Sequence, residues 1–355
     1  MIWLVVLSIL ISFIATPLVI KIAYRLGMVT DAKSSKHPAH THTGILPRGG
    51  GAAIYLAFLI PMLFFISNKI VLFLLLGATL SVIVGLLDDK YDLSPYLRFA
   101  TNILVATLAV AGGLGIPYLT NPFNGLLQLD QFVVSFSLFG NSFTLLWLAD
   151  LIAILWIVWC MNMINWSKGV DGQLPGYVAI TAFFLGILAI RFSQHDISKE
   201  IVTIMCFVTA GAFLGFLPWN FYPQKILPGY AAGSLAGYLL GVLSILSWGK
   251  LGTMMLLLAL PLTDASIVML RRISQKRSPF KGDKQHFHHV LLEMGWSRKR
   301  IAVFYWLVSL IIGTLTLFMN SREKFYALLF LVLTLSGMVI WSFHFVKNLK
   351  IQQPK

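Results

Sequence analysis

The sequence predicts an all-α polytopic membrane protein with about 10–11 transmembrane helices. Two observations lead to this prediction. The 355 residues are 58% hydrophobic and only 11% charged, with a mean hydropathy of +0.82. The apolar residues also gather in runs that are long enough to cross a bilayer as helices. A soluble domain of this length does not combine so many apolar residues with so few charges, so the sequence excludes that class.

Each apolar run is interpreted as one helix, because about 20 helical residues span the hydrocarbon core. Of these runs, the two within 231–270 have the boundary that the sequence defines least sharply. No internal repeat or low-complexity linker interrupts the chain, so 1–355 is expected to be a single integral membrane domain. The eleven runs are 2–20, 50–66, 70–87, 98–115, 144–164, 174–192, 200–217, 231–249, 251–270, 301–319 and 326–346.

Basic residues are distributed unevenly between the two sides that these helices define. One side carries 21 of the 27 Lys and Arg residues and the other side carries 6. By the positive-inside rule the richer side is cytoplasmic, which puts the N-terminus outside and the C-terminus inside. The connections on the cytoplasmic side are 21–49, 88–98, 165–173, 218–230, 271–300 and the tail from 347.

The longest outside connection, 116–143, contains no Lys or Arg. Within it, Gln128–Phe139 alternates partly between apolar and polar residues, and Gly140 and Asn141 favour a turn. The sequence therefore predicts a short external β-hairpin here.

Three aspartates, Asp88, Asp89 and Asp92, lie where the third apolar run ends. The chain has only 13 acidic residues, so three within five positions are a marked concentration. On a helix Asp88 and Asp92 would share one face. Carboxylates at a membrane edge are costly unless used, and a divalent metal or a cationic partner would stabilise them. A solvated loop at the membrane exit is the alternative.

The first cytoplasmic loop combines Lys33, Lys36 and Arg48 with three glycines, Gly49–Gly51, at the start of the next helix. Basic side chains beside a glycine-rich helix N-terminus suit a phosphate, although a basic inside loop would also contain lysines. His37, His40 and His42 lie in the same loop, and their loose spacing is more typical of no metal site.

Polar residues also mark the next two cytoplasmic loops. Asn162 and Asn165 would share one face of a helix end, and Asp171 follows in a turn. Amide and carboxylate oxygens at a helix end can bind Mg²⁺ or recognise a base or sugar, although a simple C-cap and turn would look the same. In the following loop Asn220 and Lys225 are the polar candidates.

The most basic loop, 271–300, contains His286, His288 and His289. Neither Cys nor a carboxylate cluster completes a tetrahedral zinc set there. Among Arg277, Lys281 and Lys284, these histidines are more typical of hydrogen-bond donors to a diphosphate. Cys160 and Cys206 lie in apolar runs and offer no disulfide framework.

Four separated motifs resemble the polyprenyl-phosphate N-acetylhexosamine-1-phosphate transferases, the MraY/WecA/TagO-like superfamily of glycosyltransferase family 4. The motifs are LLDDKYDLSP, NMINWSKGVDG, GFLPWNFYPQKI followed by GS, and DKQHFHH. The resemblance covers about Asp31 to Gly295. The HFHH form is closer to the branch that uses simple UDP-N-acetylhexosamines than to the muramoyl-pentapeptide branch.

The resemblance implies a reaction and a set of site residues. A polyprenyl phosphate of the undecaprenyl type attacks the β-phosphate of a UDP-sugar and releases UMP, in cell-envelope glycan biosynthesis and with Mg²⁺. Asp88 and Asp89 match the catalytic pair, and with Asn165 they would hold the metal. The expected substrate-binding residues, which include basic residues chosen for their chemistry alone, are Lys33, Arg48, Lys168, Asp171, Asn220, His286, His288 and His289.

The chain departs from the family pattern at two positions. Tyr230 stands where the family usually has an aspartate that binds Mg²⁺, and Lys168 stands where another aspartate is usual. A tyrosine is a poor ligand at neutral pH because its pKa is about 10. The resemblance therefore implies a weakened magnesium site, with turnover that is slow or absent.

Two alternatives to an active transferase remain open from the sequence. One is a non-catalytic family member that binds polyprenyl phosphate or UDP-sugar. The other, more distant, is a transporter, for which Asp150 and Asp264 are the carboxylates nearest mid-span. The expected partners are the lipid phosphate, the UDP-sugar and the membrane, with a homodimer as a further option and no nucleic acid.

Overall fold

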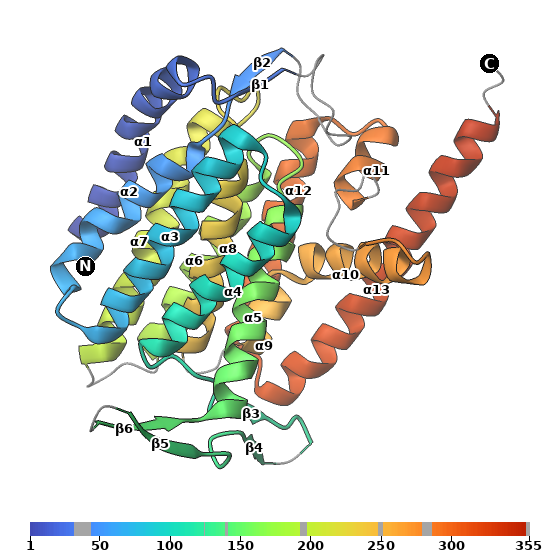
Figure 1. Ribbon diagram of the computed structural model, residues 1–355. Coiled ribbons are helices and arrows are strands. Elements are labelled where there is room, and N and C mark those ends of the chain that lie inside the picture. Colours follow the sequence, from blue (N-terminus) through green and yellow to red (C-terminus); the bar gives the residue numbers. More distant parts are fainter. Residues whose placement is uncertain are drawn as a thin grey trace.

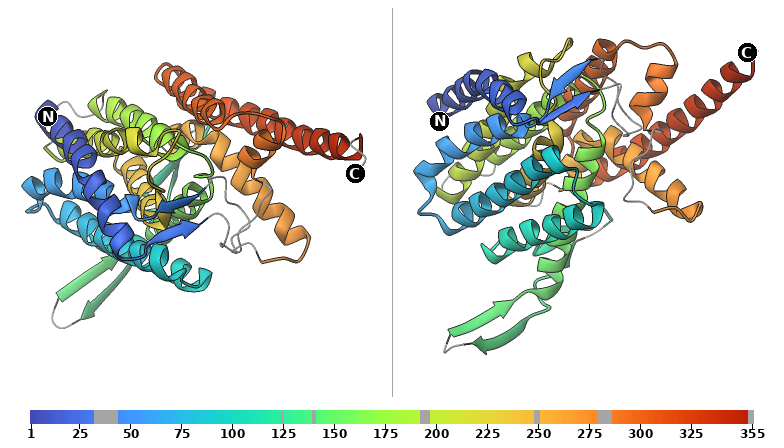
Figure 2. Two further views of the ribbon diagram at one scale, coloured as in Figure 1. Left: turned by 90° about the horizontal axis from the view of Figure 1, so that it is seen from above. Right: turned by 45° about the horizontal axis from the view of Figure 1, so that its top comes forward.

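Apolar helices that run back and forth between two ends make up most of the molecule (Figure 1). The computed structural model describes residues 1–31, 44–123, 125–138, 141–191, 197–247, 251–278 and 286–352. A small sheet lies at one end of the helices and two further hairpins lie at the opposite end, as Figures 1 and 2 show.

The helices are α1 (Ile2–Arg25), α2 (Gly50–Met62), the 3₁₀ turn η1 (Leu63–Phe65), α3 (Lys69–Tyr91), α4 (Pro95–Ala111), α5 (Trp147–Trp166), α6 (Gln173–Arg191), α7 (Ile197–Asn220), α8 (Gly229–Leu246), α9 (Leu251–Leu257), α10 (Ala259–Ser274), α11 (Phe287–Glu293), α12 (Arg298–Thr316) and α13 (Ser321–Gln352). The strands are β1 (Val29–Asp31), β2 (Ile45–Pro47), β3 (Tyr118–Thr120), β4 (Leu126–Gln128), β5 (Val134–Leu138) and β6 (Asn141–Leu145).

Each of the eleven predicted runs falls on a helix or a helix pair. In the described part of the chain, α1, α3, α5, α6, α7, α8, α12 and α13 are long and apolar enough to cross a membrane. The pair α9 and α10 forms a ninth candidate span that bends by 82° at its break, while α2 with η1 and α4 are shorter apolar helices. The predicted all-α polytopic fold is confirmed.

Helix α8 lies at the centre of the bundle. Within the apolar window of each span, 89% of α8 residues are buried, against 22% for α1 and 17% for α13. Neighbouring helices approach it through glycines: a Cβ on Gly85 of α3 would lie 2.4 Å from the Cα of Ala231. Such close backbone contacts are typical of helices that pack inside a membrane. The outer helices are left with apolar faces for lipid.

The connection between α4 and α5 contains two hairpins where the sequence predicts one. Strand β5 falls in the later part of the predicted segment and pairs with β6, which follows that segment, whereas Gln128 ends β4, which pairs with β3. The N–H groups of Leu129 and Asp130 both donate to the Pro117 carbonyl, and the side chain of Leu129 is buried. This return to Pro117 divides the alternating segment between two sheets.

At the end of the helices opposite these hairpins, the acidic segment contains the end of α3 and the start of α4. Asp92 adopts φ +50° just beyond α3, so it ends the helix and does not continue the face that carries Asp88. Ser94 then caps α4 by accepting from the Leu97 N–H, and Pro95 occupies the first helical turn. Asp92 is exposed, whereas Asp88 and Asp89 are buried.

Candidate active site

Asp88 and Asp89 lie in the last turn of α3 and have different surroundings. Asp88 is ion-paired with Arg98, whose Nη1 lies 3.4 Å from its carboxylate. Its Oδ1 is buried and has no hydrogen-bond partner among the described residues. Both oxygens of Asp89 accept from the first turn of α8, from Tyr230 N–H at 2.7 Å and Ala231 N–H at 3.4 Å.

Asp89 therefore caps α8 from another helix. A carboxylate at a helix N-terminus satisfies free N–H groups and interacts favourably with the helix dipole. Gly229 makes this approach possible, because a Cβ there would lie 2.1 Å from Asp89 Oδ2, and its φ of +73° also favours glycine.

Lys168 joins the same group from the loop after α5. Its ammonium donates to the Gly229 carbonyl and lies 5.8 Å from the ring centre of Tyr230. Burial lowers the pKa of Lys168 to about 8, and the charges of Asp89 and Asp88 limit this decrease. At neutral pH the side chain is therefore mainly a cation.

Two arginines add positive charge around the carboxylates. The guanidinium carbon of Arg98 lies 5.3 Å from the Tyr230 ring centre as well as beside Asp88. Arg48, which follows β2, is close enough to act electrostatically on Asp88, Asp89 and Lys168. Two buried carboxylates thus face three cationic side chains.

Tyr230 presents its ring, and not its hydroxyl group, to these cations. The hydroxyl donates to Asn102 Oδ1 at 3.2 Å. Asn102 also accepts from Ser234 at 3.4 Å, and Ser234 lies 2.9 Å from the hydroxyl of Ser81. This buried polar network fixes the tyrosine between α3, α4 and α8, so its oxygen is already engaged.

Asn165 faces α8 one turn further along. A Cβ on Gly233 would lie 2.5 Å from Asn165 Oδ1, and this buried oxygen has no hydrogen-bond partner among the described residues. Asn162, its predicted companion, donates instead to the Val158 carbonyl at 2.8 Å. The two asparagines therefore do not act as a pair.

Asp171 and Asn220 connect two loops. Asn220 accepts from Gly172 N–H at 3.1 Å and donates to the Ile226 carbonyl at 2.9 Å. Buried Asp171 accepts from Gln224 N–H at 3.3 Å, with Arg298 at 3.8 Å. The side chains of both predicted residues thus help to set the shape of the loops, and their contact with a nucleotide remains a prediction.

A carboxylate on α10, that of Asp264, contacts the first of the three histidines and the start of α11. His286 Nδ1 lies 3.0 Å from Asp264 Oδ2, and Phe287 N–H donates to Asp264 Oδ1 at 2.8 Å. The rings of His286 and His288 stack with centres 5.7 Å apart, and the ring of His289 lies 4.3 Å from that of His288.

His288 packs directly on the loop that carries Lys168. A Cβ on Gly169 would lie 1.8 Å from His288 Nε2. Burial lowers the pKa of His288 well below its usual value, and the neighbouring His289 and His286 lower it further. Its ring is thus neutral at physiological pH and suits hydrogen bonding rather than charge pairing, as the sequence predicts for these histidines.

The structure brings together most of the predicted site residues that it describes. Asp88, Asp89, Lys168 and Tyr230 meet at the start of α8, with Arg48 near them and His288 against Gly169. The sequence does not single out Arg98, and it indicates Asp264 only as a carboxylate for transport. Lys33 lies outside the described residues, as do Lys36, His37, His40, His42, Lys281 and Lys284.

The described side chains do not form a magnesium centre by themselves. Mg²⁺ prefers six oxygen ligands, and in proteins one or two carboxylates usually hold it while waters and substrate phosphates supply the other oxygens. Both oxygens of Asp89 are engaged by α8, and Asp88 Oδ1, although it has no hydrogen bond, lies 3.4 Å from Arg98 Nη1, which leaves Asn165 Oδ1 without a partner among the described residues. No group of three His, Cys, Asp or Glu side chains suited to a metal occurs in the part of the chain that the structure describes. The donor set therefore does not fit the metal that the resemblance implies.

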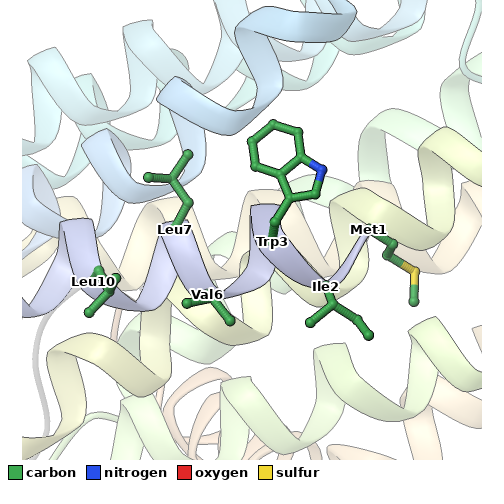
Figure 3. Close-up of a pocket in the computed structure, with 6 residues that line it drawn as sticks. All are labelled: Met1, Ile2, Trp3, Val6, Leu7 and Leu10. Carbon is green, nitrogen blue, oxygen red and sulfur yellow. The ribbon is translucent and has the colours of Figure 1, made fainter.

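A separate hollow on α1 has no such chemistry (Figure 3). It is lined only by apolar residues near the start of that helix: Met1, Ile2, Trp3, Val6, Leu7 and Leu10. An apolar face of this kind is expected where an outer helix meets lipid, so the candidate site remains the polar cluster at the start of α8.

The fold and the site together define a class of protein. It is a polytopic membrane protein with buried carboxylates, cations and histidines at one end of its helices. The family model described as "Glycosyl transferase family 4" matches residues 71–248. The chain belongs to this family.

Three similar proteins carry names of the same kind. A probable undecaprenyl-phosphate N-acetylglucosaminyl 1-phosphate transferase of Bacillus subtilis is 28% identical, over 94% of this chain and 89% of its own. A decaprenyl-phosphate N-acetylglucosaminephosphotransferase of Mycobacterium leprae is 31% identical, over 88% and 83%. A phospho-N-acetylmuramoyl-pentapeptide-transferase of Bacillus pumilus is 27% identical, over 89% and 96%. The non-catalytic and transporter alternatives gain no support from these names.

Proposed function

We propose that the protein transfers N-acetylhexosamine-1-phosphate from a UDP-sugar to a polyprenyl phosphate. An oxygen of the lipid phosphate forms a bond to the β-phosphorus, the bond between that phosphorus and the bridging oxygen breaks, and UMP leaves with the bridging oxygen. The product is a polyprenyl-diphosphate-sugar, a lipid carrier for cell-envelope glycans. The names of the relatives support this reaction class.

The observation that carries the proposal is the cluster around the start of α8. Phosphoryl transfer depends mainly on positioning and on neutralising charge that spreads over phosphate oxygens. Lys168, Arg48 and Arg98 supply positive charge, and the neutral ring of His288 adds hydrogen-bonding capacity beside them. These groups suit the diphosphate of a UDP-sugar.

The two aspartates have separate parts in this proposal. Asp88 keeps a buried oxygen without a hydrogen-bond partner, so it is the carboxylate that orients or activates the acceptor phosphate. Asp89 holds the first turn of α8. Because the Gly229 carbonyl at this turn accepts from Lys168, Asp89 also helps to position Lys168. Mg²⁺ is expected in this reaction only because the resemblance implies it.

The test is UMP release by the purified protein in lipid nanodiscs that contain a polyprenyl phosphate. UDP-N-acetylglucosamine, UDP-N-acetylgalactosamine and UDP-glucose are supplied separately, because the sequence does not select the sugar. We expect UMP and a lipid-linked product with at least one N-acetylhexosamine. Folded protein that releases no UMP with any of them, with or without added Mg²⁺, would contradict the proposal.

The orientation of the protein is a further part of the proposal. The charge distribution supports a cytoplasmic site, with the N-terminus outside and the C-terminus inside. We also propose that 1–355 forms one integral membrane domain. Self-association to a homodimer remains a prediction, which the mass of the protein in nanodiscs would test.

A further inference from the structure

We propose that Lys168 acts as a built-in cation of the diphosphate site, so that the nucleotide-sugar binds there without a divalent metal. This inference rests on the proposed function for its ligand, a nucleoside diphosphate. It goes further by assigning the charge neutralisation to a side chain of the protein.

The first argument is that Lys168 is fixed in place. Its ammonium is bound to the Gly229 carbonyl, and the following residue, Gly169, is covered by the ring of His288. The preceding residue, Ser167, is buried and lies 2.6 Å, oxygen to oxygen, from the hydroxyl of Tyr177. A lysine whose ammonium is bound and whose two neighbours in the chain are packed loses little freedom when a ligand arrives, as is required of a preorganised binding group.

The second argument is that Lys168 has bonding capacity left. An ammonium has three N–H donors, and the Gly229 carbonyl accepts one of them. Lys168 is half-buried as a residue, and the bond to Gly229 leaves two of its three donors for a ligand. The pKa of about 8 leaves it mainly protonated at neutral pH. Two charged donors that point toward a phosphate form the stronger kind of hydrogen bond.

The third argument is the balance of charge. Asp88 and Asp89 are faced by Arg48, Arg98 and Lys168, so the cluster is already positive before any ion enters. A divalent cation would be repelled by three fixed cations, whereas a diphosphate would be attracted by them. Among the described side chains, both carboxylates that could hold Mg²⁺ are engaged, Asp89 by the N–H groups of α8 and Asp88 by Arg98, which leaves Asn165 Oδ1.

The experiment measures binding in lipid nanodiscs with two probes, UDP-N-acetylglucosamine and inorganic pyrophosphate. Each is titrated in EDTA and in a MgCl₂ series. Lys168→Met removes the charge at similar length, and Lys168→Arg keeps it. Lys90→Met is the matched control, because Lys90 is exposed near the same helix end and its ammonium lies over Tyr91.

We expect wild type and Lys90→Met to bind equally well in EDTA and in Mg²⁺. In EDTA, Lys168→Met should lose at least about tenfold in affinity, as is usual when one charge of a buried pair is removed. Lys168→Arg should retain most of the affinity. Lys168→Asp should bind only when Mg²⁺ is added, because it replaces the fixed cation by another oxygen ligand.

The gain of metal dependence in Lys168→Asp is an outcome that misfolding cannot imitate. Wild-type binding that is lost in EDTA and restored by Mg²⁺ would overturn the inference, as would unchanged metal-free affinity in Lys168→Met. Failure of wild type to bind either probe in any condition would also overturn it.

These outcomes separate the inference from the proposed function. UMP release together with Mg²⁺-dependent binding keeps the function and rejects the built-in cation. Metal-free binding through Lys168 without UMP release from any UDP-sugar keeps the built-in cation and rejects the transferase.

Discussion

At the residue scale, the adjacent aspartates of α3 illustrate how tertiary contacts separate identical side chains. Asp89 is surrounded by N–H groups of α8, which stabilise its charge. Asp88 faces a guanidinium and keeps one buried oxygen free of hydrogen bonds. A buried acceptor without a partner is costly, so its persistence is typical of a functional group rather than of a structural one.

The first prediction concerns this difference. Asp88→Asn should abolish UMP release and leave thermal stability nearly unchanged. Asp89→Asn should lower both, because its amide group would oppose one N–H of α8, and the loss of such a cap costs roughly 0.5–2 kcal/mol. Asp92→Asn is the matched control, since Asp92 is exposed and its left-handed backbone suits asparagine.

Thermal unfolding in detergent and UMP release from the same preparations measure the two effects. Equal loss of stability in Asp88→Asn and Asp89→Asn would contradict the separate roles.

The second prediction follows from the pKa of Lys168, which burial lowers to about 8 while Asp89 and Asp88 oppose the change. Because a lowered lysine pKa means loss of charge in mild alkali, diphosphate binding should weaken as the pH rises through 8. Between about pH 7 and 8.5 the protonated fraction falls roughly fourfold, and affinity should follow it. Arg48 and Arg98, the other cations near it, stay charged throughout.

Lys168→Arg is the control for this profile, because its guanidinium does not titrate in that range. Pyrophosphate affinity is measured across the pH range in both proteins. A similar fall in wild type and in Lys168→Arg would assign the pH dependence to another group.

At the element scale, the start of α8 and the short helix α11 organise the site. Asp89 and Lys168 converge on the first residues of α8. Asp264 fastens the first turn of α11 by accepting from Phe287 N–H and by contacting His286. Neither arrangement follows from a local sequence pattern, because each joins residues far apart in the chain.

The third prediction treats Asp264 as a positioning residue for His286. Asp264→Asn should raise the KM for the UDP-sugar, because His286 would lose the carboxylate that fixes the proton on Nδ1. The effect should be small when His286 is already Ala, since two changes in one contact are not additive. Asp150→Asn is the control, because Asp150 lies on another apolar helix, near Gly115.

Steady-state UMP release gives KM and kcat for the single and double variants. Full additivity of Asp264→Asn and His286→Ala would show that the carboxylate acts only on overall structure.

The sequence predicts these elements well and their contacts poorly. Hydropathy and capping residues such as Ser94 are local, so helix positions are predictable to within a few residues, although α3 continues to Tyr91, beyond the predicted run that ends at 87. The 82° bend between α9 and α10, which precedes Asp264, leaves no mark on hydropathy. The cap that Asp89 gives α8 also depends on the close approach of Gly85 to Ala231, which a single sequence cannot reveal.

At the scale of the whole molecule, chemistry and charge are concentrated at one end. Hydrogen bonds join α3 and the loop after α5 to the start of α8 there, and β2 accepts from Leu227 N–H on the loop before α8. The hairpins at the opposite end come from a segment with no Lys or Arg (Figure 1). A site built at the basic end would draw UDP-sugar from the compartment on that side and lipid phosphate from the bilayer.

The last prediction therefore concerns orientation, and the chain suits a cysteine-labelling test. Both native cysteines, Cys160 and Cys206, are fully buried, so wild type should give little background with a maleimide that cannot cross membranes. Lys90→Cys reports the end that carries the site, and Phe123→Cys reports the hairpin end, where Phe123 is 70% exposed. By the positive-inside rule, Phe123→Cys should be labelled in intact cells, and Lys90→Cys only after permeabilisation. Labelling of Lys90→Cys in intact cells, with Phe123→Cys protected, would place the site outside and would exclude a UDP-sugar drawn from the cytoplasm.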